Sequence, residues 1–337
     1  MTKREMCFIV RIQKGHRGGT EMRPITQEQI EQMKNQTIGV EVEFTGITRK
    51  KAAWAVAKYF QTTPHYYGGG YKAWHIYDQQ GRKWMVEYDS SVWTANGGEQ
   101  CELVTPILKY EDIETLQEVL RALRKAGAIS RPSLRCGIHI HIGADGHDAR
   151  TLRNLTNIMA SHEDILASAI QIPYDRLSYC SATDSRFLRE VNQKKPKTMD
   201  ALERIWYNGY SQSHIHYSST RYHMLNLHSV FSKGTIEFRL FNFEEPNGER
   251  RNGIHAGQIK AYIQLCLAMS QQAKAVKYAS PTPVQQENQK YALRTWMLRL
   301  HMIGPEFETA RTLLMRNLNG NCAWRHTGPM ANTEETA

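Results

Sequence analysis

The chain has 337 residues, of which 41% are hydrophobic and 23% are charged, and its formal net charge is +10. This composition is that of an ordinary globular protein, long enough for one large domain or two modest ones. No apolar run approaches the roughly 18 residues that a membrane-spanning helix needs, and Cys7–Val10 is too short for the core of a secretion signal. Six scattered cysteines without a Cys-x-x-Cys pair argue against a zinc ribbon or a disulfide framework. We therefore expect a cytoplasmic protein with no membrane partner.

The positive charge is partly local, because Met1–Pro24 contains six Lys or Arg residues against two Glu. No basic and aromatic repeat or known nucleic-acid motif accompanies this segment. A basic balance equally suits a protein that binds nucleotide phosphates or an acidic substrate. We therefore do not expect nucleic acid to be a partner.

The first 35 residues are predicted to be an extension with one short helix, Gln27–Lys34. A strand (Ile38–Phe44) and a helix (Ile47–Phe60) follow, and Tyr66–Tyr71 is expected to be a glycine-rich loop that lacks the Lys-Ser or Lys-Thr of a P-loop. The pattern then predicts, in order, a hairpin of Lys72–Asp78 and Arg82–Asp89, a short strand at Glu102 that Pro106 ends, a helix Glu111–Ala126, a strand after Gly137, a helix Asp148–Ile170, a loop-rich stretch Ile172–Pro196, a helix Met199–Tyr210, strands Tyr222–His228 and Thr235–Phe241, and a helix Arg250–Lys274.

Residues 36–275 are predicted to form the main domain. Pro281 and Pro283 mark a linker, after which two helices, Gln285–Met302 and Pro305–Leu318, form a small module within residues 284–326. Residues 327–337 are polar and are expected to be disordered.

The strand Ile38–Phe44 carries two carboxylates on one face. Successive strand side chains point to opposite faces, so Glu41 and Glu43 project together while the alternate apolar residues face a core. Two such carboxylates repel each other unless a cation lies between them, and carboxylate oxygens are the preferred ligands of hard divalent metals.

The same polar alternation recurs on other strands. His139 and His141 share one face of an isoleucine-rich strand, Glu237 and Arg239 share a face of another, and Glu102 lies early in a third. Any one of these faces could simply meet water, as antiparallel strands often do. Water-facing strands favour Lys, Thr, Ser and Gln, however, and their occurrence together as Glu-x-Glu, His-x-His and Glu-x-Arg favours a functional site. A second His-x-His, at His214 and His216, lies in a serine-rich loop without carboxylates and is interpreted as a chance occurrence.

In chain order the chain contains the motifs Glu41-x-Glu43, Asp89-x-Ser91, Glu102-Leu-Val-Thr-Pro, Gly137-x-His139-x-His141, Arg221 with Asn226, and Thr235-Ile-Glu-Phe-Arg239. With these motifs it resembles the amidoligase family, which belongs with the glutamine synthetase and glutamate–cysteine ligase type of carboxylate–amine ligases. The resemblance spans roughly residues 38–274, and the C-terminal helices are also similar to those of the family.

The resemblance implies an α+β fold like the glutamine synthetase catalytic domain, in which a curved, mainly antiparallel sheet presents a concave polar face as the active site and is backed by helices. It also implies that a substrate carboxylate takes the γ-phosphoryl group of ATP to give an acyl phosphate, from which an amine displaces phosphate to form an amide. By resemblance, Glu41, a histidine and Glu237 would hold one metal ion, and Glu43 and Glu102 would help to hold another.

The residue types support this chemistry independently, because phosphoryl transfer depends mainly on neutralising charge. Two Mg²⁺ or Mn²⁺ ions could be held by Glu41, Glu43, Glu102, Glu237 and either His139 or His141. Arg239 would clamp a phosphate, and Arg221 is a second candidate for the phosphate or for the substrate carboxylate. Asp89 is the candidate to hold or deprotonate the amine, with Ser91 beside it. Asn226 either contacts the nucleotide or ties down backbone.

Two other functions stay open from sequence. A metal-dependent hydrolase is one, because His-x-His on a strand also opens the zinc site of amidohydrolase barrels, although carboxylate-rich ligands favour Mg²⁺ over Zn²⁺. A non-catalytic nucleotide-binding relative is the other. The substrates would be a carboxylate and an amine, as small molecules, peptides or proteins, and residues 174–197 and the N-terminal extension are expected to shape the acceptor pocket.

Overall fold

The structure is a computed structural model and describes residues 27–245, 253–284 and 287–323. The basic segment 1–24, the predicted start of a helix at Arg250 and the predicted disordered tail 327–337 lie outside these described residues.

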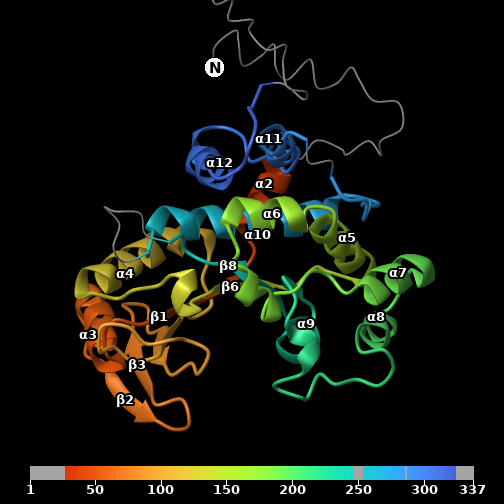
Figure 1. Cartoon of the computed structure of the whole chain (residues 1–337). Helices are drawn as coiled ribbons and strands as arrows, with labels where there is room; N and C mark the ends of the chain where they lie inside the picture. The colour runs from red at the N-terminus through yellow and green to blue at the C-terminus, as the bar shows by residue number, and fades with distance from the viewer. Residues whose placement is uncertain (1–26, 246–252, 285–286, 324–337) are drawn as a thin grey trace, which may run out of the picture.

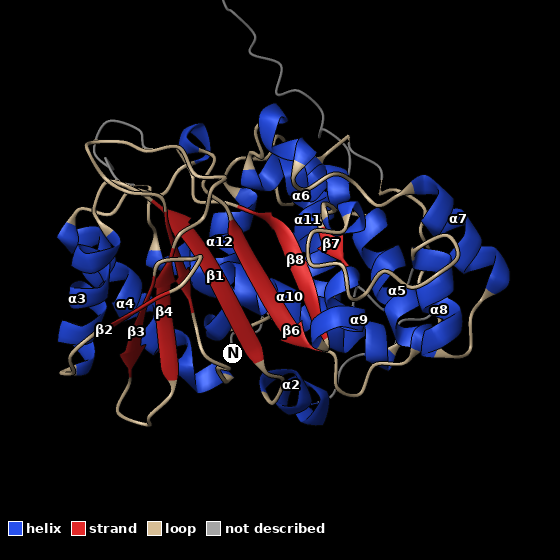
Figure 2. Cartoon of the chain, turned by 90° about the horizontal axis from the view of Figure 1, so that it is seen from below, coloured by secondary structure: helices blue, strands red, loops and turns tan. Residues whose placement is uncertain are grey.

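An open sheet of eight strands forms the centre of the fold (Figures 1 and 2), and its spatial order is β2-β3-β4-β5-β1-β6-β8-β7. The strands are β1 Ile38–Phe44, β2 His65–Gly68, β3 Ala73–Tyr77, β4 Lys83–Glu87, β5 Cys101–Val104, β6 Ile138–Gly143, β7 Leu225–Asn226 and β8 Thr235–Phe241. All seven neighbouring pairs are antiparallel. The expected α+β class with a curved antiparallel sheet is confirmed.

Helices cover one face of the sheet. The described helices are α2 Gln27–Lys34, α3 Arg49–Phe60, α4 Ile113–Ala126, α5 Ala149–Ala160, α6 Glu163–Ile170, α7 Ser185–Lys194, α8 Met199–Trp206, α9 His228–Lys233, α10 Ala256–Ala275, α11 Gln289–Arg299 and α12 Glu308–Met315. The helix α10 packs on β6, and α3 packs on β3 and β4. In Figure 2, α10 lies behind the central strands, so the viewer faces the side of the sheet opposite to α10.

The apolar alternation of three central strands builds the core between sheet and helices. Val40 and Val42 of β1 are fully buried. The side chains at the equivalent positions of β6 and β8 are equally buried: Ile138, Ile140, Ile142, Ile236, Phe238 and Leu240. Each such side chain contributes about 1.5–3 kcal/mol of transfer free energy on burial. The strand period therefore turns the remaining, polar residues of these strands to the other face.

The C-terminal helices complete this core. The helix α12 packs against α10, and both α11 and α12 lie beyond α10 as seen from the sheet (Figure 1). Their apolar residues Leu293, Met297 and Leu314 belong to the same buried cluster as the sheet core. Whether residues 284–326 are a separate module stays a prediction.

Four local predictions were wrong in detail. The predicted strand Tyr222–His228 is only the two-residue β7, because the Asn226 side chain accepts the backbone N–H of His228 and the helix α9 begins there. The predicted helix Asp148–Ile170 is two helices, because His162 leaves helical geometry and precedes α6. The predicted glycine-rich loop begins with the strand β2, and α10 begins at Ala256, later than predicted, with His255 as its N-cap.

Among the described residues, no helix combines the length and apolar character needed to cross a membrane.

Two half-buried histidines make the helical layer sensitive to acid. The His162 ring stacks on Trp296 of α11 with centroids 3.9 Å apart, and burial lowers its pKa from 6.5 to about 4. Burial likewise lowers the pKa of His147, which lies before α5, to about 3. A histidine with a depressed folded pKa binds its proton first in the unfolded chain. Its contribution to stability is therefore complete above pH 6.5 and is lost as the pH falls toward the folded pKa.

We expect the free energy of unfolding, measured with urea, to fall between pH 6.5 and 4, with up to about 3 kcal/mol of the loss due to His162. His162→Phe keeps a ring against Trp296 but removes the titration, so its stability should depend less steeply on pH. The same change at the exposed His65 is the control. An equal slope in the wild type and in His162→Phe would contradict the assignment.

Candidate active site

A row of polar side chains crosses the helix-free face of the sheet. The strand register places Glu87 of β4 opposite Glu102 of β5, and Glu102 opposite Glu43 of β1. It continues with Glu41 of β1 opposite His139 of β6. On the far side, His141 pairs with Glu237 of β8, which pairs with Asn226 of β7. Motifs separated by nearly 200 positions in the chain are thus brought side by side.

The row is buried, although its strands alternate as water-facing strands do. Glu43 is 5% exposed and Glu237 is 3% exposed, and His139, His141 and Glu102 are buried as well. Ionisable side chains are rarely buried unless they are paired or bind a metal. The interpretation that these polar faces simply meet water is therefore wrong for this row.

Three overlapping groups in the described chain bring ligand atoms within 4.8 Å of one another: Glu41 with His141 and Glu237, Glu41 with Glu102 and His139, and Glu43 with Asp89 and Glu102. These groups contain every residue that the sequence predicted as a metal ligand. The structure therefore brings the predicted set together, while the binding of a metal by any of them stays a prediction.

Glu41 lies at the centre of the row. Its carboxylate is 3.0 Å from His139 Nδ1 and 3.4 Å from His141 Nε2, and the Lys233 amine is 4.0 Å away. Burial acts to raise the pKa of Glu41, but the nearby charge of His141 and the hydrogen bond with His139 outweigh it, so that its pKa lies well below the ordinary value. Glu41 is therefore a carboxylate in its ionised form.

The β4–β5–β1 side of the row carries an excess of negative charge. Burial, followed by repulsion from Glu41 and Asp89, raises the pKa of Glu102 well above its ordinary value. The same causes, burial first, raise the pKa of Glu87. Like charges on directly opposed strand positions destabilise a sheet. A cation among these carboxylates would remove the repulsion.

The donor set fits a divalent metal. His141 Nδ1 is 2.9 Å from the Thr235 hydroxyl, a contact that fixes the ring, while His141 Nε2 is buried and has no hydrogen-bond partner. An imidazole that is held at one nitrogen by a hydrogen-bond partner, and turns its other nitrogen toward carboxylates, has the usual arrangement of a metal-binding histidine. The oxygen-rich remainder suits Mg²⁺ or Mn²⁺ better than Zn²⁺.

Arg239 lies beside Glu237, one of the predicted metal ligands, and is itself buried. Its Nη1 donates to Glu237 at 2.5 Å and its Nε to the carbonyl of Tyr179 at 3.4 Å. Burial acts to raise the pKa of Glu237, but Arg239 and His141 outweigh it and lower that pKa to about 2. Arg239 and Glu237 thus both stay ionised, while the Nε of Arg239 is directed to the Tyr179 carbonyl.

This arrangement agrees with a comparison of the sequence with family models. The model described as "Putative amidoligase enzyme" matches residues 34–270. The chain belongs to this amidoligase family. A search of curated proteins found no match. Among solved structures, a bifunctional glutathione synthetase from Pasteurella multocida is similar at 15% identity and a TM-score of 0.42. That likeness covers 86% of this chain and 48% of the glutathione synthetase, so the chain spans about half its length.

The other predicted site residues of this amidoligase take different places. Asp89 joins Glu43 and Glu102, and its carboxylate accepts the backbone N–H of Ser91 at 2.6 Å. Asn226 is buried, and its amide donates to Glu237 at 2.6 Å and accepts from the backbone of His228. These contacts are those of a residue that orients Glu237, and a direct contact with nucleotide stays a prediction.

Arg221 lies at the edge of the site, outside the three groups. Its guanidinium lies 5.7 Å from the Tyr217 ring centroid and 5.8 Å from the Tyr222 ring centroid, and Nη1 donates to the carbonyl of His216. Arg239 lies 5.8 Å from the same Tyr222 ring. The two arginines therefore flank one aromatic ring on the β7–β8 side of the site, and Arg221 forms no ion pair with any described residue.

Sequence analysis did not assign Glu87 or Lys233 to the site. Glu87 enters it only through the pairing of β4 with β5, which the sequence of β4 does not specify. Lys233 is the last residue of the helix α9. This helix was not predicted from the sequence, which favoured a strand, Tyr222–His228, just before it. His214 and His216 lie outside the three described groups, and their interpretation as a chance occurrence stays a prediction.

A hydrogen bond between two tyrosines joins the two sides of the site. The hydroxyls of Tyr71 and Tyr217 are 3.1 Å apart. Tyr71 is tied to the end of β4, because its carbonyl accepts the N–H of Tyr88. Tyr217 is tied through Arg221 to the β7–β8 side. Because β5, β1 and β6 lie between β4 and β8, this pair, here termed the tyrosine bridge, spans the strands that carry the row.

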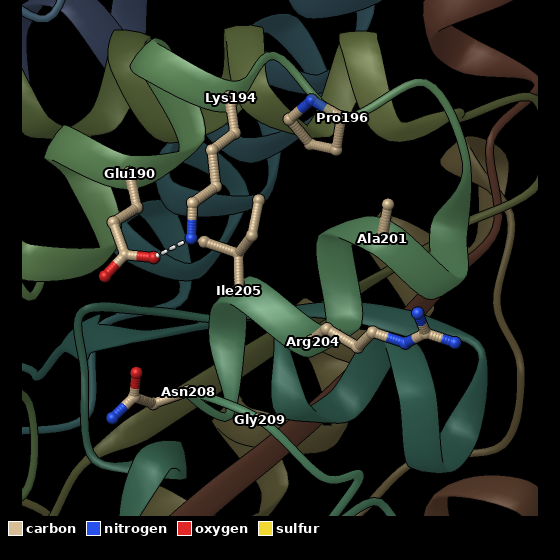
Figure 3. Close-up of a pocket in the computed structure, with 8 residues that line it drawn as sticks. All are labelled: Glu190, Lys194, Pro196, Ala201, Arg204, Ile205, Asn208 and Gly209. Atoms are coloured by element: carbon tan, nitrogen blue, oxygen red, sulfur yellow. Dashed lines mark hydrogen bonds and ion pairs between the residues drawn. The ribbon is translucent and has the colours of Figure 1, made fainter.

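A hollow also lies away from the polar row. It has a volume of about 470 Å³ between α7 and α8 (Figure 3) and is lined by Glu190, Lys194, Pro196, Ala201, Arg204, Ile205, Asn208 and Gly209. Glu190 and Lys194 pair with each other at 2.6 Å across its wall. None of the predicted catalytic, nucleotide-binding or metal-binding residues lines this hollow, although Glu190, Lys194 and Pro196 belong to the stretch 174–197 that was expected to shape the acceptor pocket.

The repulsion at Glu102 can be tested by thermal unfolding. Without divalent cations at about pH 8, Glu102→Gln should unfold several degrees above the wild type, because it removes a charge that opposes Glu43 and Glu41. Mn²⁺ should then raise the melting temperature of the wild type more than that of Glu102→Gln, since a bound ligand stabilises the fold. Glu114→Gln, on the exposed start of α4, is the control and should change neither value. A variant that gains no stability, or that responds to Mn²⁺ as the wild type does, would contradict this view of the site.

Proposed function

We propose that this amidoligase family member is an ATP-dependent carboxylate–amine ligase that acts with Mg²⁺ or Mn²⁺ and forms an amide or peptide-type bond through an acyl phosphate. The observation that carries the proposal is the buried row of carboxylates and imidazoles across β5, β1, β6 and β8, with Arg239 at its edge. Phosphoryl transfer is catalysed mainly by metal ions and cationic side chains that neutralise phosphate charge, and hard oxygen ligands beside a buried guanidinium suit that task.

Each part of the row has a place in this chemistry. Glu41, His141 and Glu237 would hold one divalent ion, and Glu43 and Glu102 would help to hold a second one, beside Asp89. We assign the first ion to His141 because its Nε2 lacks a protein partner, whereas His139 is hydrogen-bonded to Glu41. Bound ions of this kind supply charge neutralisation to phosphate oxygens.

The chain's own groups would bind and orient the reactants. Arg239 would hold the γ-phosphoryl group while a substrate carboxylate oxygen attacks its phosphorus and ADP leaves. The amine nitrogen would then attack the carbonyl carbon of the acyl phosphate, and inorganic phosphate would leave with the electrons of the C–O bond. Asp89 would hold the incoming ammonium and take the proton that the nitrogen must lose before attack. Arg221 would bind an anionic group of a substrate or of the nucleotide.

The tyrosine bridge also suits this reaction. An acyl phosphate is open to attack by water, and active sites that form reactive intermediates exclude water by closing over them. Tyr71 and Tyr217 span the strands that would hold the intermediate. The bridge would have to open for the substrates to enter and close before the amine attacks.

The hydrolase alternative has less support. The zinc barrels that carry His-x-His on a strand are built from parallel strands, whereas the neighbouring strands of this sheet are antiparallel and the sheet is open. A non-catalytic relative would not need to keep the three groups of ligands together. The experiment below separates all three functions.

We expect the protein to release phosphate from ATP with Mg²⁺ only when both a carboxylate and an amine are supplied from a panel of amino acids, peptides and polyamines. Arg239→Lys should lower kcat by about a hundredfold or more, because an amine cannot copy the planar fork, while Mn²⁺ binding stays close to that of the wild type. Glu237→Gln should lose Mn²⁺ binding itself, and Glu114→Gln is the control for both. Product is checked by mass spectrometry.

Ester hydrolysis without ATP would support the hydrolase instead, and Mn²⁺-dependent ATP binding without any turnover would support the non-catalytic relative. ATP binding that survives unchanged in both Glu41→Gln and Glu237→Gln would contradict the metal assignment.

The bridge has its own test. Tyr71→Phe and Tyr217→Phe each remove the hydroxyl–hydroxyl contact but keep the rings. We expect each to raise ATP hydrolysis in the presence of the carboxylate alone by several-fold relative to amide formation, because water then reaches the acyl phosphate. Tyr210→Phe, an exposed tyrosine near the same loop, is the control. A hydrolysis-to-ligation ratio equal to that of the wild type would show that the bridge does not exclude water.

A further inference from the structure

A buried arginine outside the polar row is hydrogen-bonded to the backbone at the ends of two strands that carry the site. Arg176 lies in a short 3-10 helix, Tyr174–Ser178, and is 4% exposed. Its Nη1 donates to the carbonyls of Cys136 and Phe241 at 3.1 and 3.0 Å, and its Nη2 to the carbonyl of Arg239 at 3.4 Å. One guanidinium thus joins the start of β6 to the end of β8.

The space that this guanidinium occupies exists because residue 137 is a glycine. A Cβ on Gly137 would lie 2.4 Å from Arg176 Nη2, 2.9 Å from Cζ and 3.0 Å from Nη1. The first two distances are closer than real Cβ atoms make and the third is tighter than most, and all three are to the planar fork of one residue. Gly137 belongs to the motif that precedes the two histidines, and its backbone has an ordinary φ, so the requirement for glycine is one of space.

Gly137 in turn orients a site carboxylate. Its N–H donates to Glu43 Oε2 at 2.5 Å, and its carbonyl accepts the N–H of Glu43 at 3.1 Å. On the other strand, Arg176 binds the carbonyl of Arg239, and the segment that follows Arg176 places the Tyr179 carbonyl against the Arg239 guanidinium. The same short helix therefore reaches both Glu43 and Arg239.

We infer that Arg176 is a positioning residue that sets Glu43 and Arg239 relative to each other, and that Gly137 is required to admit its guanidinium. The inference rests on the proposed function, in which Glu43 helps to hold the second metal ion and Arg239 holds the transferred phosphoryl group. Arg176 touches neither reactant in this scheme and acts through the backbone of β6 and β8. A loss of Arg176 therefore affects the second metal group and the phosphate clamp together.

The site offers an internal comparison that separates positioning from general stability. Among the described residues, no hydrogen bond or ion pair joins Glu41, His141 or Glu237 to Gly137 or to the Arg176 guanidinium, and the one indirect link is Arg239, whose carbonyl accepts from Arg176 and whose Nη1 donates to Glu237. A residue that only stabilises the fold would weaken both metal groups when it is replaced. A positioning residue at this end of the strands weakens the Glu43 group more than the other, because Gly137 donates directly to Glu43 whereas Glu237 is reached only through Arg239.

The experiment is a double-mutant cycle of Gly137→Ala and Arg176→Lys, read by Mn²⁺ titration with calorimetry and electron paramagnetic resonance. Lysine keeps the charge but lacks the fork that joins three carbonyls. We expect the wild type to bind two Mn²⁺ ions and each single variant to bind one of them at least tenfold more weakly, the magnitude typical of lost support behind a metal ligand. The double variant should be no weaker than Arg176→Lys, because the added methyl group then meets no guanidinium.

The matched control is Arg186→Lys, since Arg186 also donates to two carbonyls, those of Ile205 and Trp206, but away from the row. It should leave both Mn²⁺ ions bound as in the wild type. Equal weakening of both ions in the single variants, additive effects in the double variant, or unchanged binding in Arg176→Lys would each overturn the inference.

A wild type that binds no Mn²⁺ would end the proposed function rather than the contact itself. In that case the melting temperatures of the same four proteins decide the coupling. Gly137→Ala should lower the melting temperature by several degrees in the wild-type background and by much less in the Arg176→Lys background. Equal decreases in both backgrounds would show that Gly137 does not make room for Arg176.

Discussion

Repulsion between buried carboxylates is the constraint around which this fold is organised. Glu87, Glu102 and Glu43 stand in register on three adjacent strands; Glu102 and Glu43 are buried and Glu87 is half-buried, so little water screens them. At the other side of the row, imidazoles and Arg239 balance Glu41 and Glu237, and the pKa values of those two carboxylates are lowered rather than raised. The row is therefore polar from end to end but charged unevenly, with its uncompensated side at β4, β5 and β1. Under the proposed function, metal ions or a substrate ammonium would supply the missing positive charge.

A sheet that holds such a row needs a rigid foundation, and the opposite face provides it. The valines, isoleucines and phenylalanines of β1, β6 and β8 are fully buried against α10 and its neighbours. Because strand side chains alternate, each apolar contact on one face fixes the position of a polar residue on the other. A slip of one residue in register would move the whole polar set into the helical core. The apolar residues thus specify the site as much as the polar ones do.

The strand periodicity allowed the faces of β1, β6 and β8 to be predicted from the sequence, and with them the residues that meet in the row. The pairing could not be predicted to the same degree. Glu87 joins the site through the order of strands in space, and Arg176 through a loop whose sequence shows no regular pattern. The segment around Asn226 misled the prediction because its apolar alternation suggested a strand, whereas the Asn226 side chain starts a helix after two residues. Local side-chain hydrogen bonds of this kind compete with strand formation and leave little trace in periodicity.

The family resemblance ends near residue 270, within α10, yet the molecule does not end its packing there. Nearly every residue along α10 is shielded from solvent, glutamines included, and part of that shielding comes from α12. The segment that matches the family model is therefore shorter than the segment that buries its own apolar surface. A truncation at the end of the family match would expose a long apolar side of α10 to solvent. The protein would then be prone to aggregate before its activity could be assayed.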